Sequence, residues 1–448
     1  MQGYRLAGPF SDCLSSGPGF ITYSEASQTL EKGDGTTVQL LLVTSRWPLT
    51  STHEFLDQEI PRLAEVFDRI VVAPMRPDGP LNVKLPPGVA VDRSLADAFE
   101  VSTLSGGRRS RRITAIGRLV VPNPAGFGST LGELMDEGVN RSWLAQSLRI
   151  RADSQSVSRW ARTIGEPDLA YTFWLGAATV GLRTALPDTP LVSRAHGGDL
   201  FPAQHGWHSI PFQRAAVSAV DLLASVSGGG KETLATAFPE ARPKLLTSRL
   251  GTPDLGGQAP PPAARPLRVI SVSSVDRNKR VDLLARVVQR LAQTGEGVEW
   301  THLGDGPGFP DLGTQVASLG LSANVTLKGQ VPLSVVHHEL RFGNHNVFVN
   351  LSLSEGAPMS LMEAQSVGIP VVATRVGGTP EVVPQRWNEL VDPSDPVERL
   401  AAAVTRAVDR PEPERERRRA HWAENYSAET NYAAWANELR KLALTGRP

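Results

Sequence analysis

The feature of this 448-residue chain that most constrains its fold is a strand–helix–strand alternation that occurs twice. VQLLLVTS, Val38 to Ser45, is an apolar run rich in β-branched residues; the helical pattern HEFLDQEIPRLAEVF follows, and RIVVAPM is a second strand. Strands and helices joined by short connections form βαβ units, which imply a parallel sheet with helices on both faces. The alternation resumes at DLAYTFW, PLVSRAHG and AVDLLASVSGGG.

A stretch without apolar periodicity divides the chain. GTPDLGGQAPPPAARP, residues 251–266, is stiffened by proline and reads as a linker. The strand–helix rhythm then restarts at LRVISVSSV and continues through VEWTHLGDG, NVTLKGQV and HNVFVNLSLS. We therefore predict two Rossmann-like, doubly wound α/β domains at residues 37–250 and 267–425, with a C-terminal helix at 426–448 that packs back on the first domain.

Composition narrows the class of protein. The chain is 40% apolar and 21% charged, as in soluble globular proteins, and its 46 basic and 46 acidic residues give no global field that would recruit nucleic acid. A single cysteine, Cys13, excludes an internal disulfide and suits a reducing cytoplasm. No apolar run is long enough to span a bilayer, and no secretory signal is apparent. Residues 1–36 lack a period, so we expect a poorly ordered extension, with a structured element as the alternative.

The densest motif is SEGAPMSLMEAQSVGIPVVATRVGGTPEVV, Ser354 to Val383. It follows a strand pattern, and Pro358 suits the first position of a helix because its missing N–H would be unpaired there. Gly356 would let a ligand approach the backbone closely. The free amides beyond it and the helix dipole form an anion site at the carboxyl end of a parallel strand, the edge at which open α/β sheets bind ligands.

Two glutamates flank this anion site. Glu363 follows Pro358 by roughly 7–8 Å along a helix that rises about 1.5 Å per residue, which is near the span from a diphosphate to a ribose. Glu355 falls on the opposite side, where a sugar on the far phosphate would lie. The spacing predicts a nucleoside diphosphate with a polar group beyond it; an ordinary turn with surface glutamates is the alternative. The next turn, VGGTPEVV, repeats the device, with Thr379 as N-cap and Pro380 in the first turn.

The combined pattern SEGxPxSxxEAxxxGxPVVATxVGGxxEVV resembles the retaining, nucleotide-sugar-dependent glycosyltransferases of family 4, which have the two-domain GT-B fold. The resemblance covers roughly residues 38–445. SRAHGGDL, SVSSVDRNKRVDLL and EWTHLGDGPG are similar to the branch active in exopolysaccharide and colanic-acid-type synthesis. The resemblance implies that the two domains face each other across a cleft, that the donor binds mainly to the second domain, and that no cofactor or metal is needed.

The resemblance also implies roles for particular residues. In such enzymes an arginine and a lysine in the segment SVSSVDRNKRVDLL usually hold the diphosphate. Lys279 matches the lysine, with a solvated helix-start lysine as the alternative. Ser274 stands at the usual arginine position, and Arg277 or Arg280 could substitute. In LGDGPG, Leu303 to Gly308, the glycine turn is implied to lie near the nucleoside, although any tight turn could have this pattern.

His196 matches a histidine that lies at the interdomain cleft near the donor sugar; a loop histidine without a ligand is the alternative, and Asp199 is a weaker candidate. The resemblance argues against a metal held by His196, His205 and His208. The expected catalytic residues are therefore His196, Glu355 and Lys279. The expected donor-binding residues are Glu363, Gly356, Ala357, Pro358, Met359, Ser274, Arg277, Arg280, Gly304, Asp305 and Gly306.

The roles of two segments of the first domain are not defined by the sequence. Many relatives carry a Gly-Gly pair after the first strand, which is absent from SRWPLTSTHEF, so the cleft-facing groups within Thr44–Thr52 are undefined and Glu54 belongs to an acceptor site or to none. GGRRSRRITAIGR, residues 106–118, carries five arginines among apolar residues. Such a segment can lie on anionic lipid, which would suit a lipid-linked acceptor and a peripheral position at the inner face of the membrane. A solvated loop is the alternative.

We therefore expect a hexosyltransferase-type glycosyltransferase that moves a sugar from a nucleoside diphosphate sugar to a glycan or lipid-linked acceptor, with retention, in polysaccharide or glycolipid synthesis. The nearest enzyme rivals are a GT-B phosphorylase, a sucrose-synthase-like enzyme and a nucleotide-sugar epimerase. A phosphorylase would need a lysine for pyridoxal phosphate and a far longer chain. The rival from another class is a non-catalytic nucleotide-sugar-binding component of a membrane glycan assembly complex, which the altered Ser274 position keeps open.

Overall fold

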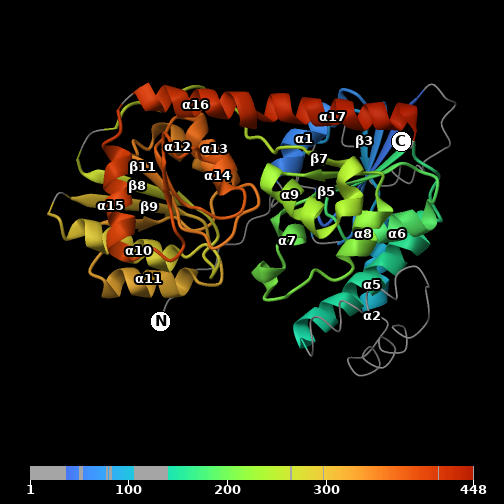
Figure 1. Ribbon diagram of the computed structural model, residues 1–448, viewed down its shortest axis with the longest axis horizontal. Coiled ribbons are helices and arrows are strands. Elements are labelled where there is room, and N and C mark those ends of the chain that lie inside the picture. Colours follow the sequence, from blue (N-terminus) through green and yellow to red (C-terminus); the bar gives the residue numbers. More distant parts are fainter. Residues whose placement is uncertain are drawn as a thin grey trace, which may run out of the picture.

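Two α/β domains lie side by side, and a pair of C-terminal helices, α16 (Pro413–Tyr426) and α17 (Ala428–Thr445), runs along one edge of both (Figure 1). The computed structural model describes residues 37–49, 54–76, 79, 83–104, 140–262, 265–295, 297–411 and 413–446. The predictions for residues 1–36, for residues 50–53 of the first loop and for the arginine-rich segment 106–118 fall outside these residues.

The N-terminal domain is built on a seven-stranded parallel sheet in the order β3-β2-β1-β4-β5-β6-β7. Its strands are β1 (Gln39–Thr44), β2 (Arg69–Pro74), β3 (Val89–Val91), β4 (Leu169–Thr172), β5 (Leu191–Ala195), β6 (Leu222–Ser225) and β7 (Leu245–Thr247). Because β1 lies between β2 and β4, the chain adds strands β2 and β3 on one side of β1 and then strands β4 to β7 on the other side. The junction of β1 and β4 is therefore a topological switch point, where such sheets bind ligands.

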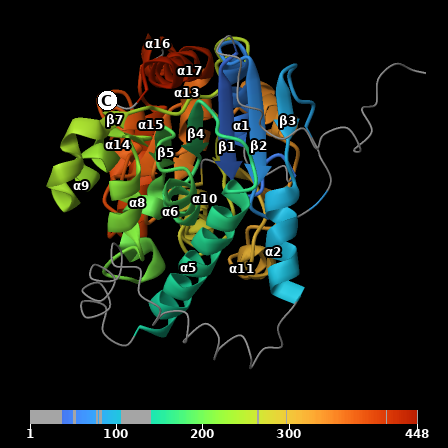
Figure 2. The same ribbon diagram turned by 90° about the vertical axis from the view of Figure 1, so that its right-hand side faces the viewer.

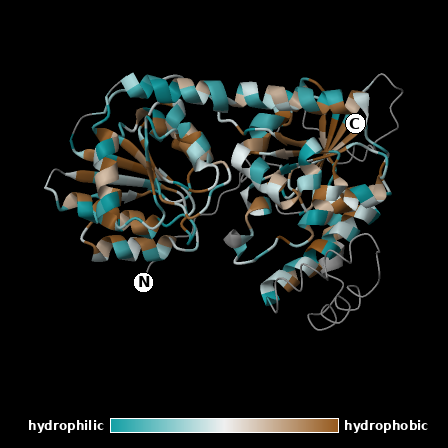
Figure 3. Cartoon of the chain, viewed as in Figure 1, coloured by the Kyte–Doolittle hydropathy of each residue, from teal (hydrophilic) through white to brown (hydrophobic). Residues whose placement is uncertain are grey.

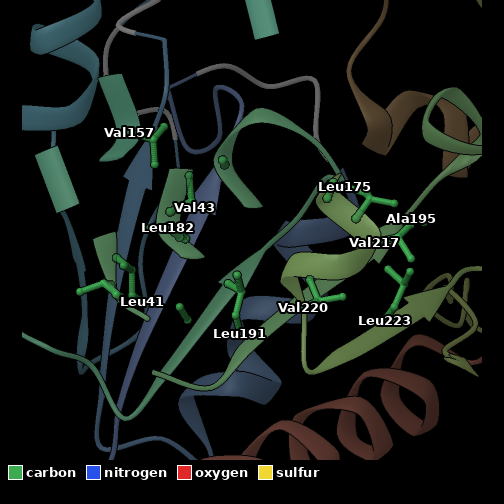
Figure 4. Packing of buried hydrophobic residues seen from close by; sticks show 14 of the residues in the cluster. Leu41, Val43, Val157, Leu175, Leu182, Leu191, Ala195, Val217, Val220 and Leu223 are labelled. Carbon is green, nitrogen blue, oxygen red and sulfur yellow. The ribbon is translucent and has the colours of Figure 1, made fainter. Parts of the chain in front are cut away.

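Helices cover both faces of this sheet because β1 is apolar on both sides. Leu41 and Val43 pack with Val157 and Leu182 on one face (Figure 4). Leu40 belongs to the cluster on the other face. Figure 2 shows α5 and α6 lying together on the first face. The helices of the domain are α1 (Glu54–Ala64), α2 (Ser94–Leu104), α5 (Arg141–Ala161), α6 (Ala177–Ala185), α7 (Gly197–Leu200), α8 (Gln213–Ala219) and α9 (Gly228–Ala237), with 3-10 helices at Pro202–His205 and Pro239–Lys244.

The C-terminal domain has a six-stranded parallel sheet in the order β10-β9-β8-β11-β12-β13, which is the strand order of a Rossmann fold. Its strands are β8 (Leu267–Val272), β9 (Val298–Leu303), β10 (Val325–Leu327), β11 (Val347–Asn350), β12 (Val371–Thr374) and β13 (Glu389–Val391). Its helices are α10 (Val281–Ala292), α11 (Phe309–Ser318), α12 (Leu333–Phe342), α13 (Met359–Ser366), α14 (Thr379–Val382) and α15 (Val397–Val408). The predicted fold class, two doubly wound α/β domains, is confirmed.

The last helix returns to the first domain. Trp435 and Leu439 of α17 are buried in the same cluster as Leu56 of α1. An ion pair lies beneath this contact: Arg194 Nη1 is 2.7 Å from Glu59 Oε2, both side chains are fully buried, and the guanidinium lies 4.8 Å from the Trp435 ring centroid. The strands form an apolar interior, while the outer helices alternate between polar and apolar residues (Figure 3).

Candidate functional site

The strand–helix corner between β11 and α13 holds the densest sequence motif. Pro358 is the N-cap of α13, with φ −73° and ψ 106°, so the helix begins at Met359, one residue later than predicted. The N-cap of α14 is Gly378, which corrects the prediction of Thr379; Thr379 is already the first helical residue, and Pro380 lies in the first turn as expected. The first amides of α13 have no acceptor within the helix, so they remain available to an anion.

Glu355 is buried in the corner, with 7% of its surface exposed. Its Oε1 accepts hydrogen bonds from Lys279 Nζ at 2.8 Å and from Asn350 Nδ2 at 3.2 Å. Asn350 ends β11, and Lys279 comes from the loop that follows β8, the neighbouring strand. Two adjacent strands therefore bring a cation and a carboxylate together at the carboxyl edge of the sheet.

Glu363 lies inside α13 and is only 4% exposed. His337 Nε2 of α12 is 3.1 Å from Glu363 Oε1. A carboxylate buried in this way keeps lone pairs for further donors, such as two ribose hydroxyls. Glu355 thus precedes the start of α13 in the chain and Glu363 lies within the helix, each with a different partner.

Two glycines in the turn after β12 pack against the backbone of the β11–α13 corner. Gly378 N donates to Glu355 O at 3.1 Å, and a Cβ on Gly378 would lie 2.0 Å from Gly356 O. Gly377 adopts φ +48°, and its Cβ would lie 1.8 Å from Glu355 O. The turn after β12 therefore presses directly on the backbone of Glu355 and Gly356, which only glycine permits.

The loop after β8 is ordered by Asp276. Its Oδ1 accepts from Asn278 N at 2.8 Å and Lys279 N at 2.9 Å, and its Oδ2 accepts from Ser274 Oγ at 2.6 Å. Asn278 Nδ2 donates to Ser354 O at 3.0 Å, which ties this loop to the motif. The loop thereby places Lys279 toward Glu355.

The two candidate arginines lie differently. Arg277 is exposed. Arg280 has φ 49° and donates from Nε to Leu351 O at 2.6 Å and from Nη1 to Pro393 O at 2.7 Å. Burial lowers the pKa of Arg280. The Arg280 side chain therefore joins two backbone segments through its Nε and Nη1 atoms, while its buried Nη2 has no hydrogen-bond partner among the described residues.

The glycine turn after β9 packs against the turn after β8. A Cβ on Gly304, at φ +132°, would lie 1.9 Å from Ser273 O, and one on Gly306 would lie 2.7 Å from Val275 O. Asp305 uses its Oδ1 to accept from Gly306 N at 2.6 Å and its main-chain oxygen to accept from Val275 N at 3.0 Å. The glycines allow the two turns to meet at the sheet edge.

The first domain reaches this corner through His196 at the end of β5. A Cβ on Gly356 would lie 2.8 Å from Gly197 N, so the two loops are in contact across the domains. His196 is 5% exposed; its Nε2 lies 3.1 Å from Phe173 O, and its ring centroid lies 4.3 Å from that of Trp174. His196 therefore sits at the domain boundary beside Gly356.

Asp199 caps the short helix that His196 begins. Its Oδ2 accepts from His196 N at 3.0 Å and from Leu175 N at 3.4 Å. Burial raises the pKa of Asp199 to about 7, because the two amides offset only part of the desolvation of the carboxylate. The carboxyl group can thus be neutral or ionised near neutral pH.

A second contact joins the domains through Glu381 of α14. Its Oε2 accepts from Gly228 N at 2.8 Å and its Oε1 from Gly229 N at 2.6 Å. These amides begin α9 in the N-terminal domain, where the helix dipole favours an anion. The motif quoted above includes Glu381, but no pattern in the sequence pairs it with the GGG segment.

A pocket of about 560 Å³ opens at the switch point of the N-terminal sheet. Thr44 at the end of β1, Trp174 and Gly176 after β4, and Asp199 after β5 line it. Trp207, with Nε1 donating to Ser142 Oγ at 2.8 Å, lines it as well. The sequence analysis did not predict this pocket, nor the roles of Asn350 and His337. Of these, only Asn350 could have been found from the sequence, because it is a polar residue at the end of a buried strand.

Comparison with known proteins agrees with this architecture. Residues 258–426 match the family model described as "Glycosyl transferases group 1". A phosphatidylinositol N-acetylglucosaminyltransferase component from Arabidopsis thaliana is 27% identical over 241 residues, which are 53% of this chain and 52% of that protein. The phosphatidylinositol N-acetylglucosaminyltransferase GPI3 component from Saccharomyces cerevisiae is 32% identical over 141 residues, 32% of this chain and 30% of its own. The match thus spans about half of the first relative's length and about a third of the second's.

A third relative is the GDP-mannose-dependent alpha-(1-6)-phosphatidylinositol monomannoside mannosyltransferase of Mycolicibacterium smegmatis, 28% identical over 277 residues, 55% of this chain and 69% of the relative. Among solved structures, sucrose-phosphate synthase from Thermosynechococcus elongatus has a TM-score of 0.65 at 17% identity, covering 91% of this chain and 100% of the other. The Anabaena protein HepE in complex with UDP has a TM-score of 0.60 at 18% identity, covering 90% and 100%.

The two facing Rossmann-like domains thus define the GT-B fold. Within the C-terminal domain, residues 258–426 are similar to the group 1 glycosyl transferases, in agreement with the coarser part of the resemblance. The narrower resemblance to the exopolysaccharide and colanic-acid branch is not what these relatives show, since all three are named for phosphatidylinositol substrates. Among the helices described, none combines the length and the apolar character needed to span a bilayer.

Proposed function

We propose that the protein transfers a sugar from a nucleoside diphosphate sugar to a hydroxyl group of a glycan or lipid-linked acceptor, with retention of configuration and without a metal ion. The observation that carries this proposal is the placement of two buried carboxylates, Glu355 before the start of α13 and Glu363 within it, with Lys279 bonded to the first. The match of residues 258–426 to the group 1 glycosyl transferases supports it.

The donor would lie across the start of α13. Its diphosphate accepts hydrogen bonds from the free amides near Ala357 and Met359, and its ribose hydroxyls donate hydrogen bonds to the Glu363 carboxylate. Negative charge develops on the diphosphate as the sugar leaves. The ammonium of Lys279, held 2.8 Å from Glu355 Oε1, and the helix-start amides then stabilise the leaving group more than the ground state.

Glu355 suits the role of a sugar-orienting group. Lys279 and Asn350 both donate to its Oε1, which leaves Oε2 for a sugar hydroxyl. Retention would follow from front-face substitution, in which the departing phosphate oxygen takes the acceptor proton. His196, next to Gly356 across the domains, would contact the donor sugar on the acceptor side.

The proposals for the acceptor and for the location of the protein are supported by the names of the relatives and by the sequence resemblance. The names of the three relatives favour a glycolipid acceptor, while the sequence resemblance favours an exopolysaccharide-type one. Either acceptor would suit a cytoplasmic protein held peripherally at the inner face of a membrane. The relatives and solved neighbours name both GDP and UDP, so both bases belong in the test.

The test is turnover by the purified chain. UDP-, GDP- and ADP-sugars are incubated with neutral and lipid-linked acceptors, and the anomeric configuration of the product is read by NMR. We expect a retained product and a kcat lowered about 10²–10³-fold in Lys279→Met, the usual effect of losing one charge-stabilising donor. Lys441→Met, an exposed change on α17, is the matched control. An inverted product, or full activity in Lys279→Met, contradicts the proposal.

The rival function is a non-catalytic donor-binding component of a larger complex. Two of the relatives are named as subunits, and a serine, Ser274, stands where the family usually has an arginine. This rival predicts donor binding with no turnover against any acceptor, and no loss of glycan in cells that carry Glu355→Ala.

A further inference from the structure

A second pocket, of about 290 Å³, lies where α5, α6 and α8 meet on one face of the N-terminal sheet (Figure 2). We call it the α5 pocket; it is lined by one face of residues 150–162 and by Val180, Thr184, Phe212 and Ala215. Because α5 ends at Ala161 and β4 begins at Leu169, the C-terminal end of α5 lies near the amino edge of this sheet, whereas the donor corner lies at the carboxyl edge of the other. Of the described lining residues, only Ile150 is shared with the pocket at the switch point. The α5 pocket is therefore a separate site.

Three arginines line the α5 pocket from one face of the helix. Arg151, Gln155 and Arg159 are four residues apart and all line it. Ser158 and Arg162, also four residues apart, line it beside them. Arg162 is the C-cap of α5, and its φ of −75° and ψ of −11° continue the helical backbone. The helix dipole favours a cation only near the last turn, so it does not account for Arg151 in the middle of the helix.

Carboxylates do not balance the positive charge at the C-terminal end of this wall. None of the described residues that line the α5 pocket is acidic. Within the described part of the chain, no ion pair includes Arg159 or Arg162, and Arg159 bonds only to Ser156 Oγ, at 3.1 Å. The neighbouring arginine on α6 differs, since Arg183 Nη2 lies 2.5 Å from Asp221 Oδ2. Two like charges on adjacent turns of a helix repel each other, so an anion between Arg159 and Arg162 would be stabilising.

A buried hydroxyl and a rigid floor accompany these charges. Ser158 is only 7% exposed, lines the α5 pocket, and forms no side-chain hydrogen bond with any residue that the structure describes. A Cβ on Gly181 would lie 2.6 Å from Ser154 O, so α5 and α6 cross in direct contact beneath the pocket. Val180 and Phe212 add apolar surface to the lining. The pocket therefore offers a fixed shape, a hydroxyl available to a ligand, and both charged and apolar walls.

We propose that the α5 pocket binds an organic phosphomonoester, whose phosphate accepts hydrogen bonds from Arg159, Arg162 and the Ser158 hydroxyl. The organic group packs on Val180 and Phe212. A phosphomonoester carries a charge of about −1.5 to −2 at pH 7, which matches two guanidiniums, and the planar fork of arginine can hold two phosphate oxygens at once. About 290 Å³ lies at the lower end of the roughly 300–1,000 Å³ of small-molecule sites, which suits a ligand with one small ring. This ligand is not a reactant of the proposed transfer, so the inference does not depend on the proposed function.

The experiment measures binding of phenyl phosphate to the full chain by calorimetry, because this probe joins a phosphomonoester to one apolar ring. Inorganic phosphate and phenol serve as its two halves, and we expect both to bind more weakly. Arg159→Gln and Arg162→Gln should each weaken phenyl phosphate about tenfold or more, and Ser158→Ala about fivefold, the usual effects of losing a charge-assisted and an ordinary hydrogen bond. Arg149→Gln removes the same charge from an exposed position of α5 that does not line the pocket, and this matched control should bind as the wild type does.

The phosphate could belong to a molecule in solution or to a lipid headgroup, and flotation with phosphatidylcholine vesicles, with and without phosphatidic acid, distinguishes these sources. Flotation of the wild type on phosphatidic acid that is lost in the double variant Arg159→Gln, Arg162→Gln assigns a lipid headgroup. Binding of phenyl phosphate without such flotation assigns a soluble organic phosphate. The proposal is overturned if the wild type binds neither probe, or if the double variant, with an unchanged melting temperature, matches the wild type in both assays.

Discussion

The contact of Glu381 with the start of α9 makes a testable prediction about domain closure. Replacing Glu381 by glutamine preserves the shape of the side chain but removes its charge and one of its two acceptor oxygens. Gly228 N and Gly229 N both point at this carboxylate, so one of them would face the amide NH₂ and lose its partner. The substitution therefore weakens a link between the domains without touching the donor corner directly.

The magnitude follows from the geometry. A hydrogen bond to a charged group contributes roughly 1.5–3 kcal/mol, and a charge at a helix N-terminus about 0.3–1 kcal/mol. Because Glu381 is half-buried, we take the lower part of this range, about 2 kcal/mol. At about 1.4 kcal/mol per factor of ten, that energy lowers the ratio of closed to open molecules about 30-fold.

Two assays measure this shift. Small-angle X-ray scattering should give Glu381→Gln a larger radius of gyration than the wild type, with a nucleoside diphosphate recovering part of the difference. Transfer should show a lower kcat/KM, by up to about 30-fold, because closure assembles the site and the loss follows the fall in the closed fraction. Glu398→Gln, an exposed change on α15, is the control. If Glu381→Gln matches that control in both assays, the contact does not hold the domains together and the reasoning fails.

Three further predictions concern stability and the corner. Arg194→Met should lower the free energy of unfolding by about 3–5 kcal/mol in denaturant titration, because Glu59 is left as an unpaired buried charge, and adding Glu59→Gln should recover much of this loss. The pKa of Asp199 is about 7 in the folded state and about 3.8 ordinarily, so between these pH values the folded state holds a proton that the unfolded state has lost. The free energy of unfolding of the wild type therefore falls as pH rises from about 4 through 7. Asp199→Asn should therefore be more stable than the wild type at pH 8, by roughly 2–4 kcal/mol, and of similar stability at pH 4; the same difference in melting temperature at both pH values would contradict this. Gly377→Ala should abolish stabilisation by the donor, since its Cβ would lie 1.8 Å from Glu355 O, whereas Gly256→Ala, with φ +86° but nothing near its Cβ, should keep it.

Much of the fold could be predicted because buried parallel strands leave a strong local signal. VQLLLVTS and HNVFVNLSLS contain strands β1 and β11, and both are apolar on each face because helices cover both sides of the sheet. The helix starts at Pro358 and Thr379 were each placed one residue away, because a proline or threonine fits the N-cap and the first turn almost equally well.

From residue spacing alone, the site could be predicted only where its parts are close in sequence; Lys279, which lies 76 residues from its partner Glu355, was indicated by the family resemblance. Glu355 and Glu363 belong to one segment, so their separation along the chain predicts that both lie near the start of the same helix. His337, which pairs with Glu363, and the amides that bind Glu381 come from distant segments, and only the tertiary fold brings them together. The roles of Arg277 and Arg280 could not be separated for the same reason, since the carbonyls that Arg280 contacts lie 71 and 113 residues along the chain.

Donor protection measured by thermal unfolding tests the central claim most directly. The wild type, Glu355→Gln and Glu363→Gln are each melted with UDP-, GDP- and ADP-sugars, with Glu398→Gln as control. The account predicts that one donor at about 100 times its dissociation constant stabilises the wild type and the control by roughly 2.7 kcal/mol, and that both corner variants lose most of this gain. Protection of all four proteins to the same extent, or of none of them by any sugar nucleotide, would contradict it.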